Sequence, residues 1–241
     1  MMRATPLFSG AGQAGRGLFR VRAYPPAAAL VFLLALFVSG CALPRPPEPD
    51  IVLPADDLAK WARVRDAERR DPSFTAYGPT MPDALRAAAW SRLRNELPKA
   101  DIMEKLEAVT AFFNQWPYSR DKDLWGVEDY WALPREFVLW SGDCEDYAIT
   151  KYYALRHLGV PADEMRVAGV WNTKRGEGHA VLIVYVDDEA LVLDNFTDKI
   201  LPGKDTPYYE PVFYVNEDFL WVHGDDEAAA ARHPSRSGKN R

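Results

Sequence analysis

The sequence predicts an α+β fold, in which a helix that carries Cys144 packs on an antiparallel sheet that carries His179 and Asp194. Three observations predict it. In the first part of the chain, apolar residues recur at the three- and four-residue steps of helices. After residue 178, short apolar stretches are separated by turn residues, as in hairpins. With 241 residues, 48% of them hydrophobic, the chain can bury a sizeable core.

The N-terminal segment has the pattern of an export signal. A basic stretch that ends at Arg22 precedes an apolar run over residues 27–38. This run is too short to span a bilayer, which takes about 20 apolar residues, and small residues follow it. Because Val38-Ser39-Gly40-Cys41 resembles the bacterial lipobox, we interpret residues 1–40 as a lipoprotein signal peptide and Cys41 as the lipidated residue. An ordinary signal peptide with an incidental cysteine is the alternative.

The residues after Cys41 predict a tether and an acidic mature domain. Five prolines fall within residues 42–54, so residues 41–55 are expected to form an extended tether. Removal of residues 1–40, which hold four arginines and no acid, changes the net charge from −6 to −10. Such a chain is not expected to bind nucleic acid. Ala42, and not aspartate, stands at the second position after cleavage. By resemblance to lipoprotein sorting in Gram-negative bacteria, this implies a protein that is anchored to the outer membrane and faces the periplasm.

Three helices are predicted before the cysteine, over residues 56–70, 82–97 and 101–114. The second is expected to bury a stripe of small and apolar side chains: Ala84, Leu85, Ala88, Ala89 and Leu93. The third begins after an N-cap, Asp101, and its apolar face comprises Ile102, Leu106, Val109, Phe112 and Phe113. The aromatic segment over residues 116–140 follows, and its rings either line a cleft or pack beneath a long loop. The folded domain is expected to span residues 56–223, before a disordered polar tail over 224–241.

Cys144 is expected at the N-terminus of a helix that Gly159 and Pro161 end. The positive end of the helix dipole favours a thiolate there. Asp143 and Glu145 flank the thiol and oppose its ionisation, so a protonated histidine or a bound cation would have to offset them. If Cys41 is lipidated, Cys144 is the leftover thiol of an exported protein. A disulfide between the two cysteines is the competing interpretation.

Residues 179–186 and 190–194 are predicted to form two strands of a hairpin. If its loop is Asp187-Asp188, His179 lies opposite Phe196 and Asp194 lies opposite Val181. His179 and Asp194 then share one face of the sheet as diagonal neighbours, about 7 to 8 Å apart at the backbone. A loop with an odd number of residues would place them on opposite faces.

Together, Cys144, His179 and Asp194 are the groups needed for acyl transfer by a thiolate, an imidazole and an orienting carboxylate. Each residue alone has a structural alternative: a buried apolar cysteine, a structural histidine and a turn aspartate. His157 falls late in its helix and is a poorer base. The joint placement favours function.

These motifs resemble the bacterial transglutaminase-like cysteine peptidases. The resemblance rests on residues 142–148 (GDCEDYA), 129–132 (DYWA), 179–182 (HAVL) and 192–195 (VLDN), and it extends from about Phe112 to Trp221. It implies a papain- or transglutaminase-like fold, with Cys144 as nucleophile, His179 as base and Asp194 as its orienter. It also implies Ca²⁺ dependence through Asp143, Glu145 and Asp146, for which capping of the helix is the alternative.

The expected function is that of a lipid-anchored periplasmic cysteine peptidase. The resemblance implies a large surface adhesin as the protein substrate, a link to biofilm regulation and an inner-membrane regulatory protein as a further partner. Two alternatives stay open. One is a transglutaminase-type acyl transferase, which would use the same nucleophile. The other is a catalytically idle lipoprotein that binds a partner through its aromatic residues.

Overall fold

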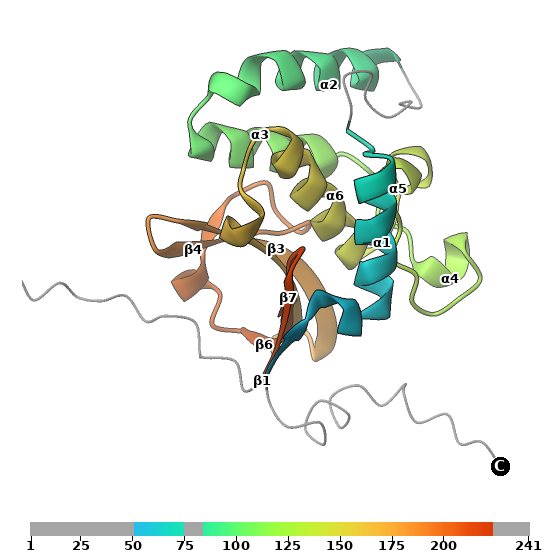
Figure 1. Ribbon diagram of the computed structural model, residues 1–241, viewed down its shortest axis with the longest axis vertical. Coiled ribbons are helices and arrows are strands. Elements are labelled where there is room, and N and C mark those ends of the chain that lie inside the picture. Colours follow the sequence, from blue (N-terminus) through green and yellow to red (C-terminus); the bar gives the residue numbers. More distant parts are fainter. Residues whose placement is uncertain (1–50, 75–83, 224–241) are drawn as a thin grey trace, which may run out of the picture. The chain divides into compact units, whose positions relative to one another are not determined.

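The computed structural model describes residues 51–74 and 84–223, and a seven-stranded antiparallel sheet organises them (Figure 1). The strand order is β1-β7-β6-β2-β3-β4-β5. The strands are β1 (Ile51–Pro54), β2 (Met165–Asn172), β3 (Glu177–Val186), β4 (Glu189–Leu193), β5 (Leu201–Pro202), β6 (Tyr209–Val215) and β7 (Phe219–Val222). The predicted combination of helices with an antiparallel sheet is confirmed. No helix within the described ranges is both long and apolar enough to cross a membrane.

The helices gather on one side of this sheet (Figure 1). The α-helices are α1 (Ala59–Arg70), α2 (Ala84–Glu96), α3 (Ile102–Phe113), α4 (Asp121–Leu124), α5 (Pro134–Trp140) and α6 (Cys144–His157). Short 3-10 turns cover Ala55–Asp57, Leu97–Lys99, Ala162–Glu164 and Gly203–Asp205. Helix α6 packs on β2 and β3, and α3 and α5 pack on α6. The helix that carries the cysteine therefore lies at the centre of the core.

The third predicted helix is confirmed, whereas the stripe predicted for the second is wrong. In α3 the Asp101 carboxylate accepts a hydrogen bond from the Glu104 N–H at 2.9 Å, as an N-cap does. In α2 the residues Ala84, Leu85, Ala88 and Ala89 are exposed and Leu93 is half-buried. Trp90 is the buried residue of this helix and packs on Phe112 and Phe113. A run of alanines does not determine which face of a helix is buried. The indole of Trp90 determines it here, because it has the largest apolar surface to bury.

The tether predicted over residues 41–55 must end earlier. Ile51–Pro54 pairs with β7 as an antiparallel edge strand, and Ala55 is buried in the core. Pro54 ends this strand at the edge of the sheet, where a residue without an N–H is tolerated. The folded domain therefore includes Ile51–Ala55, ahead of the start predicted at Asp56. The predicted signal peptide over 1–40, Cys41 and the polar tail over 224–241 lie outside the described residues.

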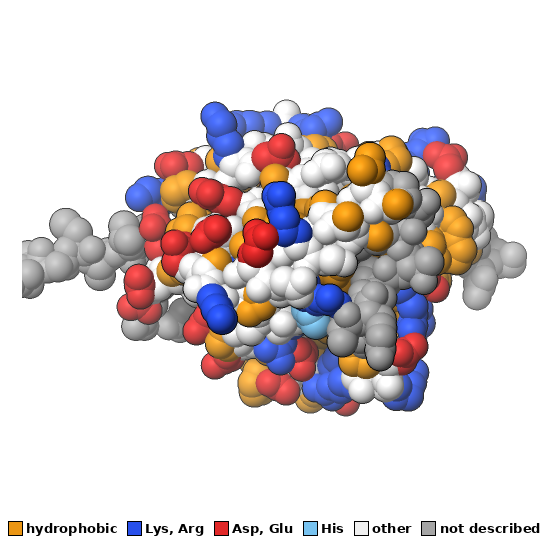
Figure 2. Space-filling model, turned by 90° about the horizontal axis from the view of Figure 1, so that it is seen from above, with side chains coloured by type: hydrophobic (Ala, Val, Ile, Leu, Met, Phe, Trp, Pro, Cys, Tyr) orange, Lys and Arg blue, Asp and Glu red, His pale blue; other side chains and the backbone are white. Residues whose placement is uncertain are grey.

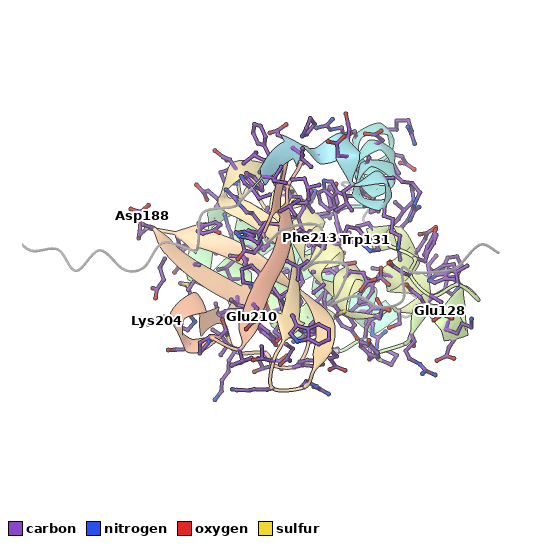
Figure 3. All side chains as sticks on the ribbon, turned by 90° about the horizontal axis from the view of Figure 1, so that it is seen from below. Glu128, Trp131, Asp188, Lys204, Glu210 and Phe213 are labelled. Atoms are coloured by element: carbon purple, nitrogen blue, oxygen red, sulfur yellow. The ribbon has the colours of Figure 1, made fainter. Side chains whose placement is uncertain are left out.

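The surface above α2 and α3 carries charges of both signs. Figure 2 shows this face, on which acidic and basic side chains are interspersed with apolar ones. In the view from below, Trp131 and Phe213 are labelled (Figure 3); the two rings stack with centroids 6.2 Å apart and pack in the main core of the domain. Phe213 lies opposite Gly169 on β2, where an added Cβ would come within 2.2 Å of its ring. Glycine at this position therefore lets the aromatic pair close over the sheet.

The β3–β4 hairpin has the predicted register. Its pairs run from Leu182 with Leu193 to Val186 with Glu189, which leaves Asp187-Asp188 as a two-residue loop. Both aspartates have positive φ, 48° and 66°, as a type I′ turn requires. The even loop keeps alternate residues of both strands on one face. This geometry places His179 and Asp194 on the same side of the sheet.

Candidate active site

The candidate site forms where the start of α6 meets the ends of β3 and β4. Cys144 is the first residue of α6 and carries a free thiol. His179 lies near the start of β3, and Asp194 directly follows β4. The Ala180 backbone N–H, next to His179 in the chain, lies beside the Cys144 sulfur and favours its ionisation. The three residues predicted from sequence thus come from the three elements expected.

His179 and Asp194 form a buried, hydrogen-bonded pair. Nε2 of His179 lies 3.0 Å from Oδ1 of Asp194, and both side chains are almost inaccessible to solvent. Burial alone would raise the pKa of Asp194, but hydrogen bonds from His179, Tyr209 and the Phe196 N–H hold it below its usual value. An ionised carboxylate can only accept, so Nε2 carries the proton and Nδ1 is the ring nitrogen left for a thiol.

Tyr209 and Phe196 complete the surroundings of this pair. The sequence analysis missed Tyr209, and it placed Phe196 opposite His179 without giving it a role. The Tyr209 hydroxyl, on β6, donates to Oδ2 of Asp194 at 2.5 Å. The Phe196 ring stacks parallel to the His179 imidazole with centroids 4.5 Å apart. The Arg175 guanidinium lies over Phe196, 4.4 Å from its centroid. The imidazole is therefore fixed by a hydrogen bond at one nitrogen and by stacking on its face.

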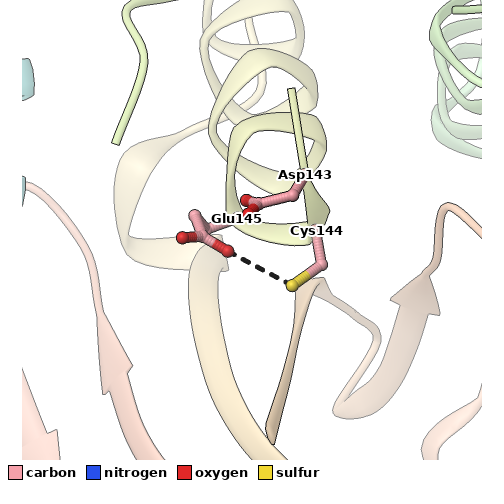
Figure 4. Close-up of side chains that lie close together, drawn as sticks. All are labelled: Asp143, Cys144 and Glu145. Carbon is pink, nitrogen blue, oxygen red and sulfur yellow. Dashed lines mark hydrogen bonds between the residues drawn. The ribbon is translucent and has the colours of Figure 1, made fainter. Parts of the chain in front are cut away.

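The side of the site that carries Cys144 is acidic. The Cys144 thiol donates a hydrogen bond to Oε2 of Glu145 at 3.2 Å, and Asp143 is the residue that precedes Cys144 in the chain (Figure 4). Burial, together with the charges of Glu145 and Asp143, raises the pKa of the thiol well above its usual value. The expected stabilisation of a thiolate by the helix N-terminus is therefore outweighed here. The sequence analysis expected Asp143 and Glu145 to oppose ionisation of the thiol, and the shift of its pKa has that direction.

The acids around the nucleophile form a larger cluster than the sequence predicted. Asp121 and Asp129 join Asp143, Glu145 and Asp146, and the sequence analysis missed both. Three groups have ligand atoms that all lie within 4.8 Å of one another: Asp143 with Cys144 and Glu145, Asp121 with Asp143 and Asp146, and Asp121 with Asp129 and Glu145. Asp129 belongs to residues 129–132, one of the blocks that carry the family resemblance. Its place in that block could have marked it as a site residue, but the sequence analysis gave it no role.

Burial and mutual repulsion raise the pKa values of these acids. Burial is the largest cause in each case: it raises the pKa of Asp143 to about 8, of Glu145 to about 7 and of Asp121 to about 6. Neighbouring carboxylates add to the shift for all three. Lys60 forms a salt bridge with Asp129, which is half exposed at the rim. The inner acids thus share a crowded, poorly solvated site.

Capping of α6 accounts for only part of this cluster. Oδ2 of Asp146 accepts a hydrogen bond from the Asp143 N–H at 3.2 Å, and Oδ1 accepts one from the Ala132 N–H at 2.6 Å. Gly142 makes room for this carboxylate, since an added Cβ would lie 2.1 Å from Oδ2. Oδ1 of Asp143 and Oδ1 of Asp121 are buried without a hydrogen-bond partner among the described residues. Buried carboxylate oxygens without a donor are suited to a cation.

The cluster fits a hard cation such as Ca²⁺. Calcium takes oxygen ligands at about 2.3–2.6 Å, so two ligands of one ion lie up to about 5 Å apart. The groupings described above satisfy that limit, and their donors are carboxylate oxygens apart from the Cys144 sulfur. Asp121, Asp143 and Glu145 are the residues best placed to hold the ion, because each belongs to two of the three groups.

The aromatic segment divides between core and surface. Trp116, Trp131 and Phe137 are buried, as expected for rings that pack beneath a loop. Tyr118 and Trp140 are about half exposed, at 53% and 54%. Tyr118 forms an isolated β-bridge with Gly142, two residues before Cys144. Tyr118 is therefore near Cys144 in the fold, and Trp140 is near it in the chain.

Comparison with known proteins identifies the family. The model of the bacterial transglutaminase-like cysteine proteinases matches residues 73–223. Legionella pneumophila LapG is 35% identical in sequence over 63% of this chain and 85% of its own, with a TM-score of 0.52. Its calcium-bound form is 34% identical over 63% and 87%, with a TM-score of 0.53, and its EGTA-treated form is 36% identical over 60% and 82%, with 0.52. No curated protein sequence matches the chain. The chain belongs to the bacterial transglutaminase-like cysteine proteinases, and it is a cysteine peptidase.

Proposed function

We propose that this peptidase uses Cys144 as its nucleophile, His179 as its general base and acid, and Asp194 as the residue that orients the imidazole. The observation that carries the proposal is the buried pair of His179 and Asp194, 3.0 Å apart, beside the first turn of α6. The hydrogen bond fixes the tautomer of His179, so that Nδ1 can exchange a proton with the thiol.

The chemistry follows from these three groups. His179 takes the proton of Cys144, and the sulfur forms a bond to the carbonyl carbon of the scissile peptide. His179 then gives that proton to the leaving amine as the C–N bond breaks, which leaves a thioester. A water molecule attacks the thioester while His179 accepts one of its protons. Release of the new carboxyl group restores the thiol and the neutral imidazole.

Calcium is proposed as a structural requirement of this site, held by Asp121, Asp143 and Glu145, with Asp129 and Asp146 nearby. When bound, Ca²⁺ would supply positive charge that lowers the cost of ionising both the acids and the neighbouring thiol. The unpartnered buried oxygens of Asp121 and Asp143 support it. Structures of Legionella pneumophila LapG in calcium-bound and EGTA-treated forms support it by analogy.

The proposed substrate is a large cell-surface protein of the adhesin type, on which the enzyme acts from the periplasmic face of the outer membrane. This part rests on similarity to LapG and on the signal pattern that precedes Cys41. A regulatory protein of the inner membrane is proposed as a further partner on the same similarity.

Cleavage can be tested on the natural protein mixture. The purified chain is incubated with outer-membrane and secreted proteins of the source organism, with Ca²⁺ or with EGTA, and new N-termini are sequenced. We expect a new terminus near the N-terminal end of a large surface protein, formed only with Ca²⁺ and absent with Cys144→Ala. Amine-modified or cross-linked products in place of new termini would instead indicate acyl transfer.

The lipid anchor has its own test. In cells that express the full chain, Cys41→Ser should move the protein from the membrane fraction to the soluble periplasmic fraction. Cys144→Ser, which leaves the lipobox intact, is the matched control and should remain with the membrane. Unchanged membrane association of Cys41→Ser would refute the anchor without affecting the peptidase assignment.

A further inference from the structure

A lysine is buried in the core directly behind the candidate site. Lys151 lies on α6, seven residues after Cys144, and its side chain is inaccessible to solvent. Its Nζ donates a hydrogen bond to the main-chain oxygen of Asp194 at 3.0 Å. The ring of Tyr147 lies 5.9 Å from the same nitrogen. Burial of an amine without a carboxylate in direct contact is costly, and such residues are uncommon unless they serve a purpose.

The cost of burying the amine is seen in the pKa of Lys151. Burial lowers the pKa of Lys151 to about 7, although the negative charges of Asp194 and Asp198 act against that shift. A methionine of similar length would fill the same space without a polar group to desolvate. Packing alone therefore gives no reason for lysine at this position. The hydrogen bond to Asp194 is the contact that a methionine could not make.

The carbonyl that Lys151 holds belongs to the residue that orients His179. Asp194 stands just after β4, where ladder pairing with β3 has ended at Leu193, so the sheet no longer fixes its backbone. Asn114, at the end of α3, donates to the same oxygen at 3.0 Å. The same nitrogen lies 3.0 Å from the oxygen of Thr197 and 2.9 Å from Oδ1 of Asp198, so its two hydrogens are shared among three acceptors. Two side chains from two helices thus fix one carbonyl.

We propose that Lys151 is a positioning residue, which ties the backbone of Asp194 to the helix that carries Cys144 and so sets the placement of the imidazole relative to the thiol. The same rigid helix, α6, would then carry Cys144 and hold the backbone of Asp194 in place. This inference rests on the proposed triad. Within the described residues, Lys151 forms no hydrogen bond with the thiol or the imidazole, so its effect has to pass through Asp194.

The test measures the rate at which iodoacetamide alkylates Cys144, which needs no knowledge of the substrate. It uses the full chain in a Cys41→Ser background with excess Ca²⁺. We expect Lys151→Met to slow alkylation about tenfold, since a misplacement of about 1 Å in a catalytic site costs up to about a hundredfold. Its melting temperature should stay equal to that of the parent or rise, because a desolvated amine is replaced by an apolar side chain. Lys199→Met, which removes an exposed lysine five residues after Asp194, should leave both quantities unchanged.

A double-mutant cycle separates positioning from a general structural role. Once Asp194→Ala has removed the carboxylate, Lys151→Met should slow alkylation no further, because the carboxylate that it positions is gone. An equal additional loss in that background would overturn the positioning role. Wild-type alkylation in Lys151→Met, with slow alkylation in His179→Ala, would also overturn it while leaving the triad in place. Wild-type alkylation in His179→Ala would overturn the triad and, with it, the inference.

Discussion

The two sides of the site satisfy their charges in different ways. On the sheet side, both carboxylate oxygens of Asp194 accept hydrogen bonds, from His179 and the Phe196 N–H at one and from Tyr209 at the other. On the helix side, carboxylates face one another, and Asp143 and Asp121 each keep a buried oxygen that has no hydrogen-bond partner among the described residues. The pKa of Asp194 is accordingly lowered, whereas those of Asp143 and Asp121 are raised.

This difference teaches which half of the site is complete without a ligand. The pair on the sheet side is preorganised by protein groups alone, so its geometry costs nothing at the moment of reaction. The helix side carries the nucleophile in an environment that opposes its ionisation. A cation would reverse that effect, and it would couple the activity of the enzyme to the supply of metal.

The largest effect is expected from removing one reacting group on either side. Cys144→Ala should abolish peptide cleavage, and His179→Ala should reduce it by about three orders of magnitude or more, as in other enzymes with such groups. Cys144 is half-buried at a helix terminus, so its loss should change the melting temperature little. Cleavage of the surface protein and thermal unfolding measure the two effects. Retained turnover in Cys144→Ala would mean that another residue is the nucleophile.

Removal of calcium should come next in size and should affect the helix side alone. A ligand bound only to the native state stabilises it by about 2.7 kcal/mol when present at 100 times its Kd. EGTA should therefore lower the melting temperature and abolish cleavage together, and Asp143→Asn should behave like the chelated enzyme. Asp198→Asn, on the sheet side, is the control and should keep its response to Ca²⁺. Equal melting temperatures in EGTA and in excess Ca²⁺, with cleavage retained, would leave the acids as caps of α6.

A methyl group at Gly142 tests the cluster by geometry. In Gly142→Ala the new Cβ would overlap Oδ2 of Asp146. The Asp146 carboxylate has two backbone hydrogen bonds to lose, one at each oxygen. Overpacking of a tight site costs about 1–3 kcal/mol, so the free energy of unfolding should fall by that amount and Ca²⁺ should bind more weakly. Gly203→Ala, where the nearest atom lies 3.3 Å away, should cost much less. Urea unfolding and calcium titration give both quantities; similar losses in the two variants would argue against the clash.

Sequence patterns predicted the sheet side of the site better than the helix side. The even hairpin loop fixed the faces of His179 and Asp194, because side-chain direction alternates strictly along a strand. Asp121 could not be assigned in this way, since it reaches the cluster from a short helix within an irregular segment. Tyr209 likewise comes from β6, which is separated from β4 in the sheet by β2 and β3. Contacts of this kind depend on tertiary packing, for which no local period exists.

The two sides should also differ in the sign of their pH dependence. Asp143 and Glu145 have folded pKa values near 8 and 7, above those of the unfolded chain, so the folded state binds protons more tightly. Stability of the calcium-free protein should therefore fall as pH rises from about 4 to 8. The lowered pKa of Asp194 acts in the opposite direction, and its contribution should be lost only below about pH 4. Unfolding free energies in EGTA across this range test the sign, and saturating Ca²⁺ should flatten the slope. A slope of the same size with and without Ca²⁺ would separate the acids from the metal.

The smallest effect is expected from loosening the sheet side by one hydrogen bond. Tyr209→Phe removes the donor to Oδ2 of Asp194 and leaves the bond from His179 to Oδ1 in place. A hydrogen bond of this kind contributes about 1.5–3 kcal/mol when one partner is charged, and less when water replaces the lost donor. Tyr209 is half-buried, so water can reach the vacated position. The free energy of unfolding is therefore expected to fall by an amount near the lower end of that range. Cys144 alkylation should slow only a few fold, because the imidazole keeps its tautomer.

Tyr208→Phe is the matched control, since the neighbouring ring is half-buried but does not bond Asp194. If Tyr209→Phe slowed alkylation as much as Asp194→Ala, the hydroxyl and not the carboxylate would be the group that holds His179 in place.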